Sequence, residues 1–135
     1  MPTFTISEYF ADHAATPGSG AFERKLLDLH AQDFRKQLAA GVPVAMGSDV
    51  GPFPHGTQAR ELVLMAKYGM KPLAVLQAEF LNGARLLGWE GQIGELRPGY
   101  YADIIAVPVS PLEDMSAVEH VSFVMKGGVI AKPAP

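Results

Sequence analysis

The feature that most constrains the fold is an apolar run from Val42 to Gly47, which contains no polar residue. A strand with one face in water alternates apolar and polar residues, so an unbroken run favours a parallel strand that is covered on both faces. Pro43 fits such a strand only near its first residue. The run therefore predicts an α/β fold, and a chain of 135 residues is expected to form one domain.

Helical spacing is found on both sides of this predicted strand. Apolar residues from Phe22 to Leu38 recur every four residues, and Gly41 stands where a C-terminal cap is expected. Thr57 is placed to cap a second helix that ends near Gly69, and Pro72 suits the first turn of a third. On that third helix, the spacing predicts a core-facing side made of Leu73, Leu76, Phe80, Ala84 and Leu87.

The first residues of the chain differ from this helical middle. Pro2 to Ile6 is predicted to be extended, and Ala14 to Gly20 is predicted to be a loop around Pro17-Gly18. Gly18-Ser19-Gly20 precedes a helix and could hold an anion, but it lacks the third glycine of a dinucleotide motif. A turn and helix cap is the better interpretation.

The last third of the chain has β character. Glycines and prolines separate β-prone runs at Tyr100–Val107 and Val121–Met125, and Lys126-Gly127-Gly128 predicts a tight turn into a further strand from Val129. We therefore expect a boundary near Gly88. Residues 1–88 would form a helical βα part and residues 89–135 a small β part.

Composition argues against several classes of partner. The net charge of −3 and the pI near 5.7 argue against nucleic acid and anionic membranes, which favour basic patches. No run approaches the ~20 apolar residues of a membrane span. The absence of cysteine excludes disulfides and thiolate chemistry, and it is compatible with the reducing cytoplasm. An upstream signal peptide stays open, because Met1 need not be the true start.

Asp49 is the most informative single residue, because it follows Gly47-Ser48 directly after the predicted strand. Reactive groups in parallel sheets and barrels gather at the C-terminal ends of strands. A carboxylate there can bind a divalent metal and accept a proton from an attacking water. An aspartate that only shapes a loop would fit the spacing equally well.

The histidines are weaker candidates. His55 lies six residues after Asp49 in a Gly/Pro-rich loop, where it could bind a metal or a substrate, could orient a metal ligand, or could be an ordinary surface residue. His30 belongs to the helical series and is expected to be a packed or partly exposed helix residue, while His13 and His120 have no suggestive neighbours beyond single carboxylates.

Two further acidic positions are interpreted as structural. Asp103, at a strand entry, is expected to bind backbone amides or a neighbouring cation. Arg60-Glu61 begins a predicted helix and is expected to be solvated.

In order along the chain, a set of segments resembles the eighth-strand region and C-terminus of amidohydrolases, in the imidazolonepropionase-like and Xaa-Pro dipeptidase-like branch. Each segment is weakly specific alone, but the ordered set covers Gly41 to Ile130 nearly continuously. The segments are Gly41–Asp49, Pro54–Gly56, Arg60–Leu62, Gly69–Pro72, Asn82–Gly88, Gly94–Gly99, Ala102–Val107, Pro111–Asp114 and Phe123–Gly128.

This resemblance implies the C-terminal fragment of a TIM-like (β/α)₈ hydrolase barrel, with part of a composite β-sandwich domain. It implies that Asp49 binds a divalent metal, expected to be one or two zinc ions, and handles protons during hydrolysis of a carbon–nitrogen bond. His55 and Gly56 match the loop that faces substrate, which would be a small amide or dipeptide.

The resemblance also implies that most of the site is missing. The family's His-x-His, its bridging carboxylated lysine or glutamate and two further histidines have no counterpart here, and a barrel needs about 250 residues. Pro2-Thr3 resembles the end of a seventh strand, so Met1 would be an internal methionine or the start of a truncated gene. We therefore expect no turnover by this chain alone.

Other interpretations of the same residues belong to different classes. The chain could be a non-catalytic relic that binds or forms homo-oligomers, or one half of a split enzyme whose partner supplies the missing barrel portion. An anion-binding βα protein built on Gly18–Gly20 is the weakest alternative.

Overall fold

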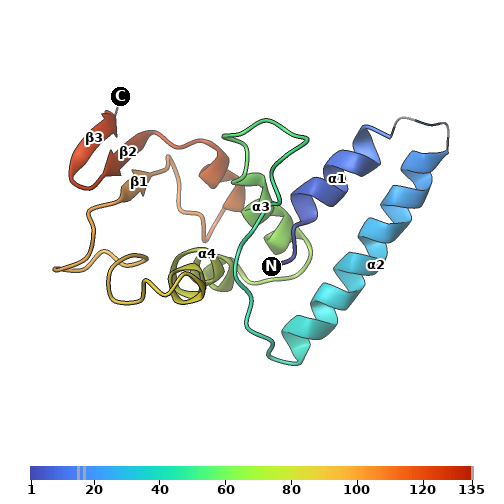
Figure 1. The fold of residues 1–135 in the computed structure, drawn as a ribbon, viewed down its shortest axis with the longest axis horizontal. Helices are drawn as coiled ribbons and strands as arrows, with labels where there is room; N and C mark the ends of the chain where they lie inside the picture. The colour runs from blue at the N-terminus through green and yellow to red at the C-terminus, as the bar shows by residue number, and fades with distance from the viewer. Residues whose placement is uncertain (15, 17, 135) are drawn as a thin grey trace.

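The computed structural model describes residues 1–14, 16 and 18–134. Four helices come first: α1 (Phe4–Asp12), α2 (Ser19–Ala39), α3 (Arg60–Lys67) and α4 (Pro72–Leu86). They are followed by β1 (Ile104–Ala106), the 3₁₀-helix η1 (Met115–Glu119), β2 (Phe123–Lys126) and β3 (Val129–Lys132). The chain is thus a mixed α/β structure, and in Figure 1 α1 and α2 lie side by side at the end opposite the strands. Among the described helices, none combines the length and apolar character that crossing a membrane requires.

The core lies where the helices meet. Phe4 of α1 is fully buried. Its ring packs edge-on against that of Phe34, with 5.1 Å between ring centroids, and at a tilt against that of Tyr68, with 4.6 Å between centroids. His30 lies 4.4 Å from the same ring, which confirms its expected packing role. Further buried members of this core are Leu27, Ala31, Val44, Leu62, Leu64, Met65, Met70, Val75, Ala78, Met115 and Val118.

The predicted extended stretch from Pro2 to Ile6 is wrong, because α1 begins at Phe4. Thr3, the residue before the helix, has a left-handed backbone (φ 54°) and its side chain makes no capping hydrogen bond. A sequence pattern cannot predict a helix whose first amides are bound by a side chain far along the chain, and Glu61 provides that side chain.

The long second helix agrees largely with its apolar spacing. α2 ends at Ala39, and Gly41 follows with φ 73°, which confirms the predicted glycine cap. The predicted loop before it ends earlier than expected, since Ser19 already belongs to α2. Ser19 donates from its backbone and hydroxyl to the Thr16 carbonyl, in keeping with the predicted turn, but the residue that precedes α2 is Gly18, which makes no side-chain cap. Ala15 and Pro17 of the predicted loop lie outside the described residues.

The predicted strand from Val42 to Gly47 is not formed as a strand. A parallel strand needs a neighbour that satisfies its backbone groups, and the three described strands pair only with one another. Part of the segment instead bonds to α4: the Met46 amide donates to the Ala78 carbonyl at 3.2 Å, and Asn82 Nδ2 donates to the Val44 carbonyl at 2.6 Å.

The predictions for α3 and α4 are correct in part. Pro72 begins α4 as expected, but α3 begins at Arg60 and the Thr57 hydroxyl donates to Pro54 instead of capping it. The predicted core face of α4 is mostly wrong. Leu73, Phe80 and Leu87 are exposed, and the buried residues of this helix are Val75, Ala78 and Ala84. The spacing identified an apolar helix, but the described chain covers a different side of it.

The β part is a three-stranded antiparallel sheet in the order β1-β2-β3. The hairpin through Gly127 (φ 56°) and Gly128 (φ 82°) confirms the predicted tight turn. Asp103 accepts a hydrogen bond from the Gly127 amide at 2.7 Å and pairs with Lys126, which confirms its structural role. η1 connects this sheet to the helices, because Met115 and Val118 are buried in the common core.

Candidate functional site

Asp49 follows the apolar segment, as predicted, and its backbone is unusual. Its φ is 53°, and among the described non-glycine residues only Thr3 shares a positive φ. Ser48, the residue before it, is buried, whereas Asp49 is exposed. A left-handed backbone is uncommon in non-glycine residues, and aspartate is among the types that adopt it, so the positive φ marks a sharp turn at Asp49.

The side chain of Met1 lies against Gly47, two residues before Asp49. A Cβ added to Gly47 would stand only 2.6 Å from the Met1 sulfur, so a larger residue would displace the exposed Met1 side chain. The start of the chain and the segment that carries Asp49 therefore lie close together.

His55 and Gly56 lie in the loop that follows Asp49, and both are exposed. Gly56 has φ 96° and its amide donates to Gln58 Oε1 at 2.6 Å. It also lines a cavity of about 310 Å³ between this loop and η1, together with Thr57, Ala59, Val118, Glu119 and Val121. The structure thus places the predicted substrate loop beside a cavity, but neither Asp49 nor His55 lines it.

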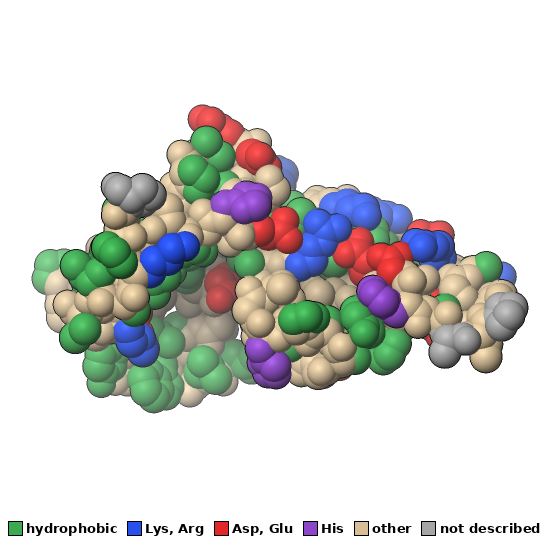
Figure 2. Space-filling model, turned by 90° about the horizontal axis from the view of Figure 1, so that it is seen from above, with side chains coloured by type: hydrophobic (Ala, Val, Ile, Leu, Met, Phe, Trp, Pro, Cys, Tyr) green, Lys and Arg blue, Asp and Glu red, His purple; other side chains and the backbone are tan. Residues whose placement is uncertain are grey.

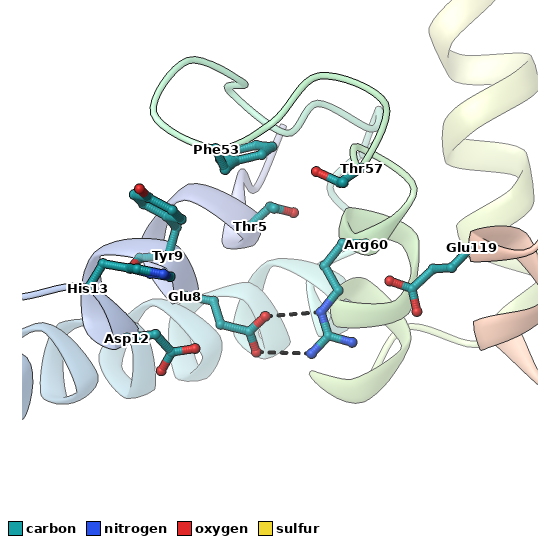
Figure 3. Close-up of a pocket in the computed structure, with 9 residues that line it drawn as sticks. All are labelled: Thr5, Glu8, Tyr9, Asp12, His13, Phe53, Thr57, Arg60 and Glu119. Carbon is teal, nitrogen blue, oxygen red and sulfur yellow. Dashed lines mark hydrogen bonds and ion pairs between the residues drawn. The ribbon is translucent and has the colours of Figure 1, made fainter.

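A second cavity of about 280 Å³ lies between α1, this loop and α3 (Figure 3). Glu8 and Arg60 meet at its floor through two hydrogen bonds of 3.0 and 3.2 Å, and Lys67 lies 3.6 Å from Glu8. The hydrogen bond from Arg60 to the Glu8 carboxylate raises the pKa of the guanidinium, and the charge of Glu119 adds to this. The pair connects α1 to α3.

Aromatic contacts attach the loop after Asp49 to α1. Phe53 is only 6% exposed, and its ring centroid lies 6.2 Å from that of Tyr9. Tyr9 in turn stacks on His13 with 4.2 Å between ring centroids, and His13 Nδ1 lies 3.0 Å from the Tyr9 carbonyl. His13 therefore has a packing role on α1, and His120 lies exposed after η1.

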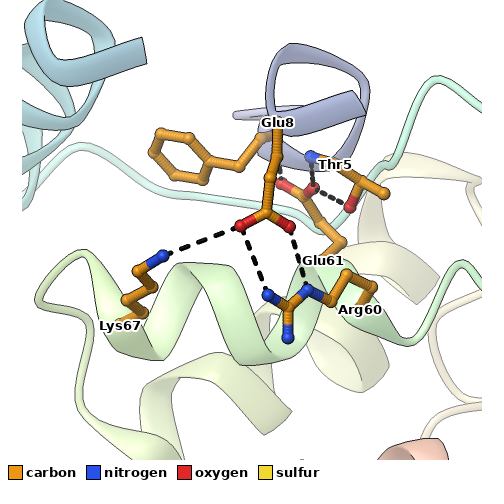
Figure 4. Close-up of polar contacts among 6 residues, drawn as sticks. Thr5, Glu8, Arg60, Glu61 and Lys67 are labelled. Carbon is orange, nitrogen blue, oxygen red and sulfur yellow. Dashed lines mark hydrogen bonds and ion pairs between the residues drawn. The ribbon is translucent and has the colours of Figure 1, made fainter. Parts of the chain in front are cut away.

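The residue that the sequence interpretation missed is Glu61. It was expected to be solvated, but it is fully buried, and its carboxylate accepts hydrogen bonds from the backbone of α1 (Figure 4). Burial raises the pKa of Glu61, and the hydrogen bonds from Thr5 and Phe4 act in the opposite direction. A signal was present: Glu61 stands three and four residues before the buried Leu64 and Met65, on the same side of a helix.

The described residues do not by themselves fit a catalytic zinc ion. Within residues 1–14, 16 and 18–134, no group of three or more histidine, aspartate or glutamate side chains could hold a metal. Catalytic zinc sites use three protein ligands. Asp49 can therefore supply at most one ligand of such a site.

Comparison with known proteins identifies the family. The sequence matches the amidohydrolase family over residues 4–131, and the chain therefore belongs to that family. It is 36% identical over 112 residues to the ochratoxinase of Aspergillus niger, and 32% identical over 120 residues to the imidazolonepropionase of Geobacillus kaustophilus. Those alignments cover 79% and 84% of this chain.

Solved structures agree with this assignment. A Xaa-Pro dipeptidase with bound methionine matches 98% of this chain with a TM-score of 0.89 and 30% identity. The A. niger ochratoxinase structure matches 98% of it with a TM-score of 0.80 and 33% identity. The chain spans only 23% and 27% of the two curated relatives, and 34% of the dipeptidase structure.

Proposed function

We propose that this chain supplies the Asp49 portion of a metal-dependent hydrolase site that acts on carbon–nitrogen bonds. The observation that carries the proposal is the left-handed Asp49 directly after the apolar segment, within the residues that match the amidohydrolase family. In this proposal residues 1–88 belong to a barrel and residues 89–135 to a composite β-sandwich.

Asp49 is proposed to act in two ways. Its exposed carboxylate is an oxygen ligand suited to a divalent metal, for which we propose zinc, with the other ligands supplied from outside the described residues. The same carboxylate can hold the proton released when water attacks the substrate. His55 and Gly56, in the loop beside the 310 Å³ cavity, are proposed to face the substrate.

The proposed substrate is a small amide, a dipeptide or a cyclic amide. The names of the similar proteins support this range, since they include a Xaa-Pro dipeptidase and an imidazolonepropionase. The 135-residue chain alone is expected to show no turnover, because one carboxylate cannot hold a catalytic metal.

A second candidate function is a module that binds another polypeptide, either as half of a split enzyme or as a non-catalytic relic. The apolar side of α4 favours it, because Leu73 is 58% and Leu87 68% exposed. Figure 2 shows hydrophobic side chains gathered at the end of the molecule that holds the sheet, beside a hollow. Exposed apolar area of this kind marks surfaces that another element covers.

The test uses the complete reading frame that contains this chain, expressed as wild type and as Asp49→Asn, beside the 135-residue chain itself. We expect zinc-dependent hydrolysis of a Xaa-Pro dipeptide or cyclic amide by the wild type, and none by the 135-residue chain. His13→Asn is the matched control, since His13 lies on α1 and packs on Tyr9. Zinc-dependent turnover by the 135-residue chain alone would refute the proposal.

A further inference from the structure

Phe53 is buried apart from the common core. Its side chain is 6% exposed, yet it is not a member of the cluster in which the helices meet. In the part of the chain that the structure describes, it is the one buried aromatic ring outside that cluster. Small apolar clusters separate from the main core are typically found beneath long loops, which they attach to the fold.

The ring of Phe53 lies against α1. Its centroid is 6.2 Å from that of Tyr9, within the range in which aromatic rings contact one another. It also lines the 280 Å³ cavity together with Thr5 and Tyr9 of α1, and Figure 3 shows the ring between the loop and this helix. The loop after Asp49 is therefore attached to α1 at residue 53.

The turn that follows Phe53 lies next to the other cavity. Gly56 lines the 310 Å³ cavity, and Thr57 and Glu119 line both cavities, which are therefore neighbours. The residues from Pro54 to Thr57 thus stand between the contact with α1 and the cavity beside which the substrate is proposed to bind. His55 belongs to the same turn and is exposed.

We propose that Phe53 is a positioning residue, which sets the turn from Pro54 to Thr57 against the 310 Å³ cavity. The proposal rests on the proposed role of His55 and Gly56 in facing the substrate. Phe53 lines only the neighbouring cavity, so it would act through the turn and not by touching the substrate. Groups that face a ligand need this kind of support, because a loop alone holds them less accurately than a packed element does.

The alternative is that the turn is held by its own hydrogen bonds. The Thr57 hydroxyl donates to the Pro54 carbonyl at 2.7 Å, and the Gly56 amide donates to Gln58 Oε1 at 2.6 Å. Both bonds are exposed, so water competes with them and each is expected to stabilise the turn only weakly. The two accounts differ in which substitution releases the turn.

The experiment is ¹⁵N relaxation by NMR on the 135-residue chain, as wild type, Phe53→Ala and Thr57→Val. In Phe53→Ala we expect the order parameters of the amides of residues 55–57 to fall from about 0.85 to below about 0.6, with those of α2 unchanged. Thr57→Val, which removes the hydroxyl donor, should change them much less.

Phe22→Ala is the matched control, because Phe22 is the same residue type but is 59% exposed on α2. It should leave the amides of residues 55–57 unchanged. Should Phe53→Ala not fold, Phe53→Leu keeps an apolar side chain without the ring, and a smaller fall is expected in the same amides. Unchanged order parameters in the Phe53 variant, or an equal fall throughout α2, would overturn the positioning role.

A second readout uses the protein that the complete reading frame encodes. Phe53→Ala is expected to raise KM about tenfold with a smaller change in kcat, because contacts to the bound substrate are misplaced. A protein that was merely destabilised would lose active molecules, which lowers kcat and leaves KM unchanged. An unchanged KM would therefore contradict the proposal.

The order parameters need neither metal nor substrate. They decide whether Phe53 holds the turn even if the Asp49→Asn hydrolysis test fails, so the failure of this inference and the failure of the proposed function can be distinguished.

Discussion

In the helical part of the molecule, Glu61 binds amides 56 and 57 residues earlier in the chain, and in the β part Asp103 binds an amide 24 residues later. Both carboxylates satisfy backbone groups that secondary structure leaves unpaired. Glu61 is fully buried and its pKa is raised by burial, whereas Asp103 is exposed and its pKa is lowered by the Lys126 hydrogen bond. The same kind of contact therefore has opposite electrostatic consequences in the two parts.

The difference teaches that the helical part depends on a few buried contacts, while the β part depends on local turn geometry. Every residue of β3 is exposed, and the hairpin is set by Gly127 and Gly128. The helical part instead brings residues from α1, α2 and α3 to one core. Substitutions in the two parts should accordingly differ in how much they lower the free energy of unfolding.

The largest expected effect is the difference in stability between two apolar truncations, one in the helical part and one in the β part. Phe4→Ala removes a fully buried ring from the contact of α1 with α2, and is expected to cost about 3–5 kcal/mol. Ile130→Ala in β3 removes a side chain that is 56% exposed, and should change stability by only about 0.5 kcal/mol. Urea unfolding of both variants measures the difference. Equal losses would break the comparison.

The next effect concerns the two carboxylates. Glu61→Ala leaves the Phe4 amide, the Thr5 amide and the Thr5 hydroxyl without their partner in a buried place, which is expected to cost about 2–3 kcal/mol. Glu79→Ala, which breaks no such hydrogen bonds, serves as the control. Urea unfolding of both variants measures the loss. If the urea midpoints of Glu61→Ala and Glu79→Ala lie equally far below that of the wild type, capping is not the source of the loss.

The pH dependence sharpens the same point. Because the folded pKa of Glu61 is raised, the stability linked to its protonation is fully present below the ordinary glutamate pKa of about 4.3, and is lost as pH rises through the raised value. Glu61→Gln removes this dependence. The wild type should therefore lose more stability than the variant as pH rises above about 4.3, and parallel curves would contradict the raised pKa.

The smallest effect is expected at Asp103. Its lowered pKa means that its contribution is present above about pH 3.9 and is lost as pH falls through the folded value. Asp103→Asn should speed exchange of the Gly127 amide at neutral pH and leave the amides of α2 unchanged. The difference from the wild type should vanish in acid. An effect that persists in acid would mean that charge is not involved.

The parts of the fold that follow from local sequence were predictable. Gly41, Pro72 and the Lys126-Gly127-Gly128 turn act within a few residues of their own positions, and each stands where the pattern placed it. α1, the entry at Thr3 and the buried Glu61 depend on contacts more than fifty residues apart. No local pattern carries that information.

The candidate site divides in the same way. Asp49 could be singled out because it follows an apolar run directly, and its positive φ supports a special position. The strand expected from Val42 to Gly47 did not form, because a run typical of a parallel strand needs partner strands, and in the described chain Val44 and Met46 bond to α4. The roles of Asp49 in metal binding and proton transfer stay predictions.

The most direct test of the central claim is the rate of zinc-dependent hydrolysis by the protein that the complete reading frame encodes. This rate is compared between wild type and Asp49→Asn at equal zinc occupancy. Because asparagine cannot accept the proton, we expect a loss of about 10²-fold to 10⁴-fold in turnover, with the fold retained. An Asp49→Asn protein that hydrolyses its substrate at the wild-type rate would contradict the account.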